Sequence, residues 1–158
     1  MKLTDVLQPT LIKYPLISDT KVEVIRELIS LLAEQHLIED KEAVLKAVLD
    51  REKIMTTGVG NGIAIPHCKS RHAPDFAIAL GIHPEGVDFQ SLDSKPVHIV
   101  FLLTGPEDKP GTHIRLLSRI SRIISRENVQ QQILNCHSAE EIYKVLQEVE
   151  DQVVEISP

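Results

Sequence analysis

Two nearly uninterrupted apolar runs constrain the fold of this chain more than any other feature. They cover residues 76–82 (Phe-Ala-Ile-Ala-Leu-Gly-Ile) and 97–103 (Val-His-Ile-Val-Phe-Leu-Leu). Strands that are covered on both faces read as continuous apolar runs, whereas strands with one wet face alternate apolar and polar residues. We therefore expect two strands of a sheet that has helices on both sides. Turn-forming residues at 84–86 and 92–96 predict turns between these strands.

Helical patterns occur before and after the two apolar runs. Capping side chains at residues 18–20 and Asp40 predict the starts of two early helices, and Ser138 with Glu141 has the spacing of a capping box. The expected helices cover residues 20–35, 41–53, 112–125, 128–134 and a final segment that begins at 138. Because helices and strands do not alternate strictly, we expect an α/β fold: a three-layer α/β/α sandwich with a mixed β-sheet.

Length and charge limit the classes of function. The chain has 158 residues, and we expect a single domain over 1–158. The net charge of −6 argues against nucleic acid as a partner. No apolar run approaches the roughly 20 residues that span a bilayer, so stable membrane insertion is not expected. Two cysteines cannot build a disulfide framework, and we expect a cytoplasmic location.

A glycine-rich segment, residues 57–67, reads Thr-Gly-Val-Gly-Asn-Gly-Ile-Ala-Ile-Pro-His. Glycine can adopt positive φ, and successive backbone amides can form a concavity that holds an anion. Pro66 stiffens the backbone that carries His67. The segment lacks the spacing of a dinucleotide fingerprint and the ending of a Walker loop. A tight turn with a buried histidine remains the alternative to an anion site. The candidate phosphate-binding residues are Gly58, Gly60, Asn61 and Gly62.

His67 is the candidate nucleophile. A histidine with an ordinary pKa near 6.5 is mostly neutral at pH 7, and its free ring nitrogen can attack a phosphoryl donor. His113, at the expected start of a helix, is a candidate partner for phosphoryl oxygens or a residue near a cap. Arg51, on the helix face of Val44 and Val48, is a candidate phosphate clamp, and it also complements the C-terminal dipole of its helix.

Other chemically distinctive residues receive less weight. Arg115, Arg119, Arg122 and Arg126 form a stripe expected to be solvated, opposite an apolar face of Ile114, Leu117, Ile120 and Ile124. Cys68 follows His67, but neighbouring residues of extended backbone point to opposite sides, so a Cys-His nucleophile pair is not expected. His67, Cys68, His72 and His83 lack a standard zinc-ligand spacing. We expect neither a metal nor a cofactor.

The motif of residues 57–67, together with Arg51-Glu52-Lys53 and the segment Thr-His-Ile-Arg-Leu-Leu-Ser that begins at Thr112, closely resembles one family. It is the enzyme IIA domain of the fructose/mannitol/nitrogen-regulatory class of the bacterial phosphoenolpyruvate-dependent sugar phosphotransferase system. The resemblance covers nearly the whole chain. It implies the three-layer fold, His67 as the phosphoacceptor and His113 with Arg51 as the supporting pair.

The resemblance also implies partners. The donor would be phospho-HPr or an HPr-like protein, docking around the glycine segment and the helix start at His113. The function expected is that of a histidine phosphocarrier, a phosphotransferase component that passes phosphate to a sugar-specific IIB of the fructose type. The alternative is a nitrogen-regulatory IIA whose phosphorylation state controls binding to regulatory partner proteins. Cys68-Lys69-Ser70 resembles fructose-type members, whereas Gly60-Asn61-Gly62 also resembles the regulatory type.

Overall fold

Two long antiparallel strands, β5 (Ala77–Val87) and β6 (Val97–Gly105), form the centre of the sheet. The computed structural model describes residues 1–156, and the side chains of residues 1–152 among them. Residues 157–158 of the expected domain lie outside this description. The remaining elements, in chain order, are α1 (Leu3–Val6), η1 (Pro9–Leu11), β1 (Ile12–Lys13), α2 (Lys21–Glu34), α3 (Lys41–Ile54), β2 (Gly58–Gly60), β3 (Ile63–Ala64), β4 (His67–Lys69), α4 (Pro110–Ile124), α5 (Glu127–Leu134) and α6 (Ala139–Ile156).

The sheet is mixed, as the sequence predicts. Its order is β1-β5-β6-β3-β2, and β4 also pairs with β6, further along that strand than β3. The β1–β5, β3–β6 and β4–β6 pairs are parallel, while β5–β6 and β2–β3 are antiparallel. Strand β6 therefore pairs along one edge with both β3 and β4, and β4 begins at His67.

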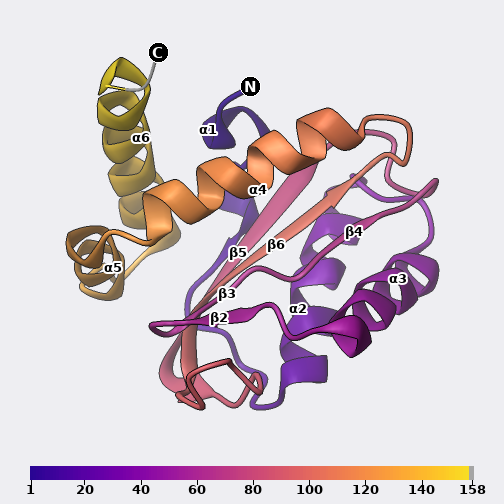
Figure 1. The fold of residues 1–158 in the computed structure, drawn as a ribbon, viewed down its shortest axis with the longest axis horizontal. Coiled ribbons are helices and arrows are strands. Elements are labelled where there is room, and N and C mark those ends of the chain that lie inside the picture. The colour runs from indigo at the N-terminus through magenta and orange to yellow at the C-terminus, as the bar shows by residue number, and fades with distance from the viewer. Residues whose placement is uncertain (157–158) are drawn as a thin grey trace.

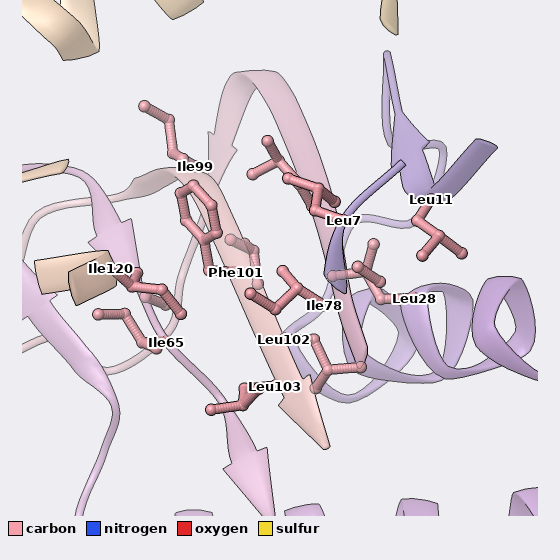
Figure 2. Close-up of a cluster of buried hydrophobic side chains, with 14 of the residues drawn as sticks. Leu7, Leu11, Leu28, Ile65, Ile78, Ile99, Phe101, Leu102, Leu103 and Ile120 are labelled. Carbon is pink, nitrogen blue, oxygen red and sulfur yellow. The ribbon is translucent and has the colours of Figure 1, made fainter. Parts of the chain in front are cut away.

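Helices cover both faces of this sheet (Figure 1): α2 and α3 lie on one side, and α4 crosses the other. Alternation along β6 serves both layers, because Phe101 points toward Ile120 of α4 whereas Leu102 points toward Leu28 of α2 (Figure 2). All four of these side chains are buried. The apolar runs are continuous because both faces of the central strands are covered along these runs, where only His98 is partly exposed.

Three helices begin directly after the capping residues predicted for them. The Thr20 hydroxyl accepts a hydrogen bond from Glu23 N, the Asp40 carboxylate accepts one from Ala43 N, and Ser138 Oγ accepts one from Glu141 N. All five expected helices are present, with bounds within about two residues of those predicted.

Two expectations are wrong in detail. The turn predicted at 84–86 lies inside β5, where the register with β6 shifts between Ile82 and Val87. Gly86 has φ +92°, and its N–H donates to Nδ1 of His83, so these residues form a bulge instead of ending the strand. Ile114, assigned to the apolar face of α4, is 64% exposed. The turn predicted at 92–96 is confirmed.

Candidate active site

The backbone at His67 is fixed by strand pairing, and the backbone just before it is fixed by a hydrogen bond to β6. His67 is the first residue of β4 and pairs with Leu103 of β6, whose N–H donates to the Pro66 carbonyl at 3.0 Å. The Nδ1 atom of His67 lies 2.8 Å from the Ile65 carbonyl oxygen. A carbonyl oxygen can only accept, so Nδ1 carries the hydrogen in the neutral ring. Nε2 is then the ring nitrogen with a free lone pair.

The surroundings of His67 favour its neutral form. Burial lowers the pKa of His67 below 6.5, and the nearby charges of Arg51 and Lys69 lower it further. The hydrogen bond to the Ile65 carbonyl and the carboxylate of Glu52 act in the opposite direction, but the net shift is downward. At neutral pH the ring is therefore uncharged, the form in which Nε2 is nucleophilic.

His113 lies next to His67. The two ring centroids are 5.7 Å apart, and the Phe76 ring lies 6.2 Å from His113 on another side. His113 is only 3% exposed, and neither of its ring nitrogens has a hydrogen-bond partner among the residues that the structure describes. Burial lowers its pKa to about 4, with smaller contributions from His67 and Lys69. The His113 ring therefore has hydrogen-bonding capacity that no group among the described residues uses.

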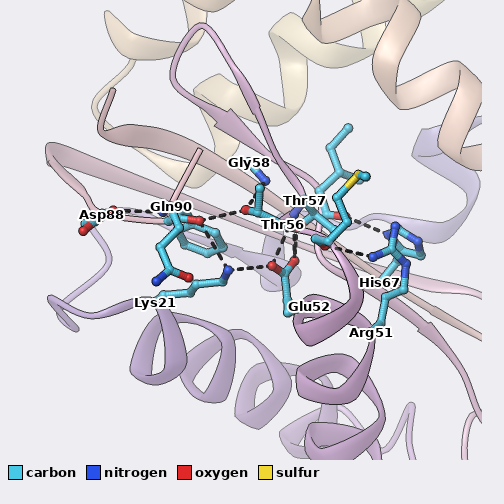
Figure 3. A network of polar contacts seen from close by, with 12 residues as sticks. Lys21, Arg51, Glu52, Thr56, Thr57, Gly58, His67, Asp88 and Gln90 are labelled. Carbon is cyan, nitrogen blue, oxygen red and sulfur yellow. Dashed lines mark hydrogen bonds and ion pairs between the residues drawn. The ribbon is translucent and has the colours of Figure 1, made fainter. Parts of the chain in front are cut away.

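Two cations flank the histidines. Arg51 is half-buried at the end of α3, and its Nη1 donates to the Met55 carbonyl at 2.9 Å, the helix-end role predicted for it. The same bond orients the guanidinium beside His67 (Figure 3). Lys69, which the sequence analysis did not select, lies two residues after His67 and therefore on the same face of β4. That period-two spacing was the signal by which Lys69 could have been found.

The tip of the glycine segment lies away from the histidines. β2 and β3 form a hairpin whose tip has positive φ at Gly60, Asn61 and Gly62, as glycine-rich sequence allows. β3 pairs with β6 at Ile99 and β4 pairs at Leu103, four residues and about 13 Å further along the strand. The Asn61 N–H donates to the Asp93 carboxylate at 3.0 Å.

The structure therefore does not bring Gly60, Asn61 and Gly62 to His67. Gly58 lies nearer the base of the hairpin, paired with Ala64, and its N–H donates to Thr56 Oγ1. The positive φ values at the hairpin tip form the tight turn between β2 and β3.

Cys68 lies beside the histidines without being a second nucleophile, and the arginine stripe does not line the hollow that contains them. The Cys68 side chain is buried, and burial raises the pKa of its thiol to about 12, so it is not an activated nucleophile. Arg119 lies 3.7 Å from Glu150 of α6, and Arg115 donates to Thr112 Oγ1. Among the described residues, no group of three or more His, Cys, Asp or Glu is placed to hold a metal ion.

The site is a surface hollow with an apolar margin. Its lining includes the two histidines, Arg51, Lys69 and the apolar side chains Ile54, Ile114 and Leu117. Ile54 is 80% exposed and Ile114 is 64% exposed. A neutral imidazole nucleophile, two cations and an unpaired buried ring can receive an anionic group, and exposed apolar side chains beside them can receive a protein surface.

Comparisons with known proteins agree with this geometry. A family model described as "Phosphoenolpyruvate-dependent sugar phosphotransferase system, EIIA 2" matches residues 5–149. The fructose-specific EIIABC component of Bacillus subtilis is 38% identical over 146 residues, which are 92% of this chain but 23% of that protein. A nitrogen regulatory protein of Bradyrhizobium diazoefficiens is 34% identical over 149 residues, 92% of this chain and 95% of that protein.

A solved structure is similar as well. The crystal structure of the nitrogen regulatory protein IIA-Ntr from Neisseria meningitidis matches with a TM-score of 0.85 and 28% identity, over 91% of this chain and 98% of that one. In the part of the chain that the structure describes, no helix has the length and apolar character needed to cross a membrane. The resemblance read from the sequence is confirmed, and the chain belongs to the EIIA 2 family of the phosphoenolpyruvate-dependent sugar phosphotransferase system.

Proposed function

We propose that this chain is a phosphocarrier and that Nε2 of His67 is the atom that bonds to phosphorus. The observation that carries the proposal is the hydrogen bond from Nδ1 to the Ile65 carbonyl, which leaves the Nε2 lone pair free. The lowered pKa of His67 keeps that lone pair available at neutral pH. No separate base is needed, because the attacking nitrogen carries no proton.

The transfer of the phosphoryl group from donor to His67 needs no cofactor. The Nε2 lone pair forms the bond to phosphorus while the N–P bond to the donor's phosphohistidine breaks, and the donor nitrogen recovers that electron pair. A positive charge develops on the His67 ring during the transfer. The Ile65 carbonyl stabilises this charge because it accepts the hydrogen bond that Nδ1–H donates. In the onward step a nucleophilic atom of the next acceptor bonds to phosphorus while the N–P bond to Nε2 of His67 breaks, and Nε2 recovers that electron pair.

The neighbouring groups would stabilise the transferring phosphoryl oxygens. Arg51 offers a permanently charged guanidinium with N–H groups besides the one that the Met55 carbonyl accepts. His113, neutral at pH 7, offers one N–H donor that has no partner among the side chains and backbone groups described. Lys69 adds a positive charge from the surface side. Donors held in place before the reaction are typical of electrostatic stabilisation.

The donor proposed is phospho-HPr or an HPr-like protein, docking over the apolar margin of the hollow. Ile54, Met55 and Ile114 are 80%, 60% and 64% exposed, and Arg51 lies among them. The docking face expected from the sequence surrounded the glycine segment and the helix start at His113. The surface proposed here includes that helix start through Ile114 and leaves out the hairpin tip. The net charge of −6 suits a basic carrier and would mainly raise the association rate.

Labelling tests the phosphoacceptor. The protein is incubated with enzyme I, HPr and radioactive phosphoenolpyruvate, and the incorporated label is measured. We expect incorporation into the wild type, none into His67→Ala, and wild-type incorporation into His137→Ala, a matched control at an exposed histidine. The bond should resist alkali and break in acid, as a phosphoramidate does. Full labelling of His67→Ala would contradict the assignment.

Relatives of two kinds support two onward roles, transfer to a fructose-type IIB protein and control of regulatory partners. Phosphorylated protein is incubated with purified IIB domains, and the label on each protein is followed. Transfer of the label to IIB supports the carrier role. A stable phosphoprotein whose binding to a regulatory partner changes with phosphorylation supports the regulatory role.

A further inference from the structure

A buried ion pair lies beside the site without touching His67. Lys21, the first residue of α2, places Nζ 2.7 Å from Oε2 of Glu52 in the last turn of α3. The two side chains are 16% and 5% exposed. Lys21 also donates to the Phe89 carbonyl at 3.3 Å. The pair therefore ties together α2, α3 and the connection that follows β5.

From this pair, a continuous chain of hydrogen bonds leads to the imidazole (Figure 3). The Glu52 carboxylate accepts from Thr57 N, with both oxygens at 3.2 Å, and also from the Thr57 hydroxyl. The Thr57 carbonyl accepts from Ile65 N at 3.0 Å. The Ile65 carbonyl in turn accepts from Nδ1 of His67 at 2.8 Å.

We propose that Glu52 is a positioning residue for His67, acting through Thr57 and Ile65 to hold the ring with Nε2 free, and that Lys21 holds Glu52 in place. The proposal rests on the proposed role of His67 as phosphoacceptor. Glu52 also follows Arg51 directly on α3, so the same anchor fixes the end of the helix that carries the guanidinium.

The burial of this pair favours a positioning role over a general contribution to stability. Removing two charges from water costs about as much as their attraction returns, so a buried ion pair adds little net stability over apolar side chains. What it adds is a directional constraint, because a carboxylate with three donors around it fixes their relative placement. Here two of the three donors belong to Thr57, at the base of the hairpin that leads to His67.

The first test reads the tautomer of His67 in the unphosphorylated protein. Histidine side chains are labelled with ¹⁵N, the spectra are recorded at pH 8, and His67 is assigned by its absence in His67→Ala. We expect the wild type to hold His67 with the hydrogen on Nδ1. Glu52→Ala and Lys21→Met should give a mixture of tautomers. Glu52→Gln keeps an acceptor for Thr57 and should retain more of the wild-type tautomer.

The second test is the rate of phosphoryl transfer from phospho-HPr. Because Glu52 and Lys21 lie beneath the surface, KM for the donor should stay unchanged while kcat falls about 10- to 100-fold, since displacing a reacting group by about 1 Å can cost about 10²-fold in rate. Lys2→Met is the matched control: it breaks an exposed ion pair with Asp151 outside the hollow and should leave both tautomer and rate unchanged.

A folded Glu52→Ala protein whose His67 keeps the hydrogen on Nδ1 and whose kcat equals that of the wild type overturns the proposal. If Glu52→Ala does not fold, Glu52→Gln and Thr57→Val, which removes only the hydroxyl link, are judged by the same two measurements. If wild-type His67 takes up no phosphate, the proposed function fails, whereas the tautomer measurement still decides the role of Glu52.

Discussion

The buried ring of His113 should make the stability of the protein depend on pH in a measurable way. Its pKa is lowered from 6.5 to about 4 in the folded protein, chiefly by burial, and the side chain is 3% exposed. The unfolded chain therefore binds one more proton than the folded protein between pH 6.5 and about 4. The stability that His113 contributes is complete above pH 6.5 and is lost as pH falls through this window.

The size of this loss in the free energy of unfolding follows from the shift in the pKa of His113. At about 1.4 kcal/mol per unit of pKa, the full loss is about 3 kcal/mol, of which about 2 kcal/mol is lost between pH 7.5 and pH 5. The assay is urea denaturation of the wild type and of His113→Gln at both pH values. Other titrating groups, including His67, are present in both proteins and largely cancel in the comparison.

We expect the wild type to lose about 2 kcal/mol more free energy of unfolding than His113→Gln on going from pH 7.5 to pH 5. His113→Leu, which fills the site with an apolar side chain, should show the same reduced dependence. Equal pH dependence in the wild type and both variants would contradict this expectation. It would mean that the folded protein accepts a proton on His113 as readily as the unfolded chain does.

Three further outcomes are expected. Arg51→Ala should slow phosphoryl transfer about 10²–10³-fold in a single-turnover assay, the usual cost of losing one such donor; an unchanged rate would leave Arg51 only its bond to the Met55 carbonyl. Native protein should resist iodoacetamide at pH 7.5, because burial raises the pKa of both Cys68 and Cys136; alkylation as fast as in urea would contradict this. Glu150→Ala should destabilise the protein by about 1–3 kcal/mol in urea denaturation, since this buried carboxylate accepts from the backbone at Leu3 and Thr4; an unchanged midpoint would contradict it.

Local patterns in the sequence predicted most of the fold. The continuous apolar runs identified β5 and β6 because strands covered on both faces need no polar alternation. Capping side chains identified the helix starts because they bond within three residues of themselves. His67, His113 and Arg51 were selected from their local sequence context, and the family resemblance implied that they act together. The structure places them around one hollow.

What the sequence could not predict depends on distant partners. The bulge in β5 forms because the His83 ring accepts the N–H of Gly86, which makes a turn-like segment part of a strand. The apolar pattern of α4 could not show that Ile114 faces outward beside the hollow. Lys21 and Glu52 are 31 positions apart, and their pairing depends on how α2 and α3 pack together.

The most direct test of the central claim is to identify which ring nitrogen carries the phosphoryl group. The protein is labelled with ¹⁵N at histidine and phosphorylated through enzyme I and HPr, and the coupling between phosphorus and each ring nitrogen is recorded by NMR. The hydrogen bond between Nδ1 and the Ile65 carbonyl requires the new bond at Nε2 of His67, with Nδ1 still protonated. Coupling to Nδ1 of His67, or to a nitrogen of another histidine, would contradict the account.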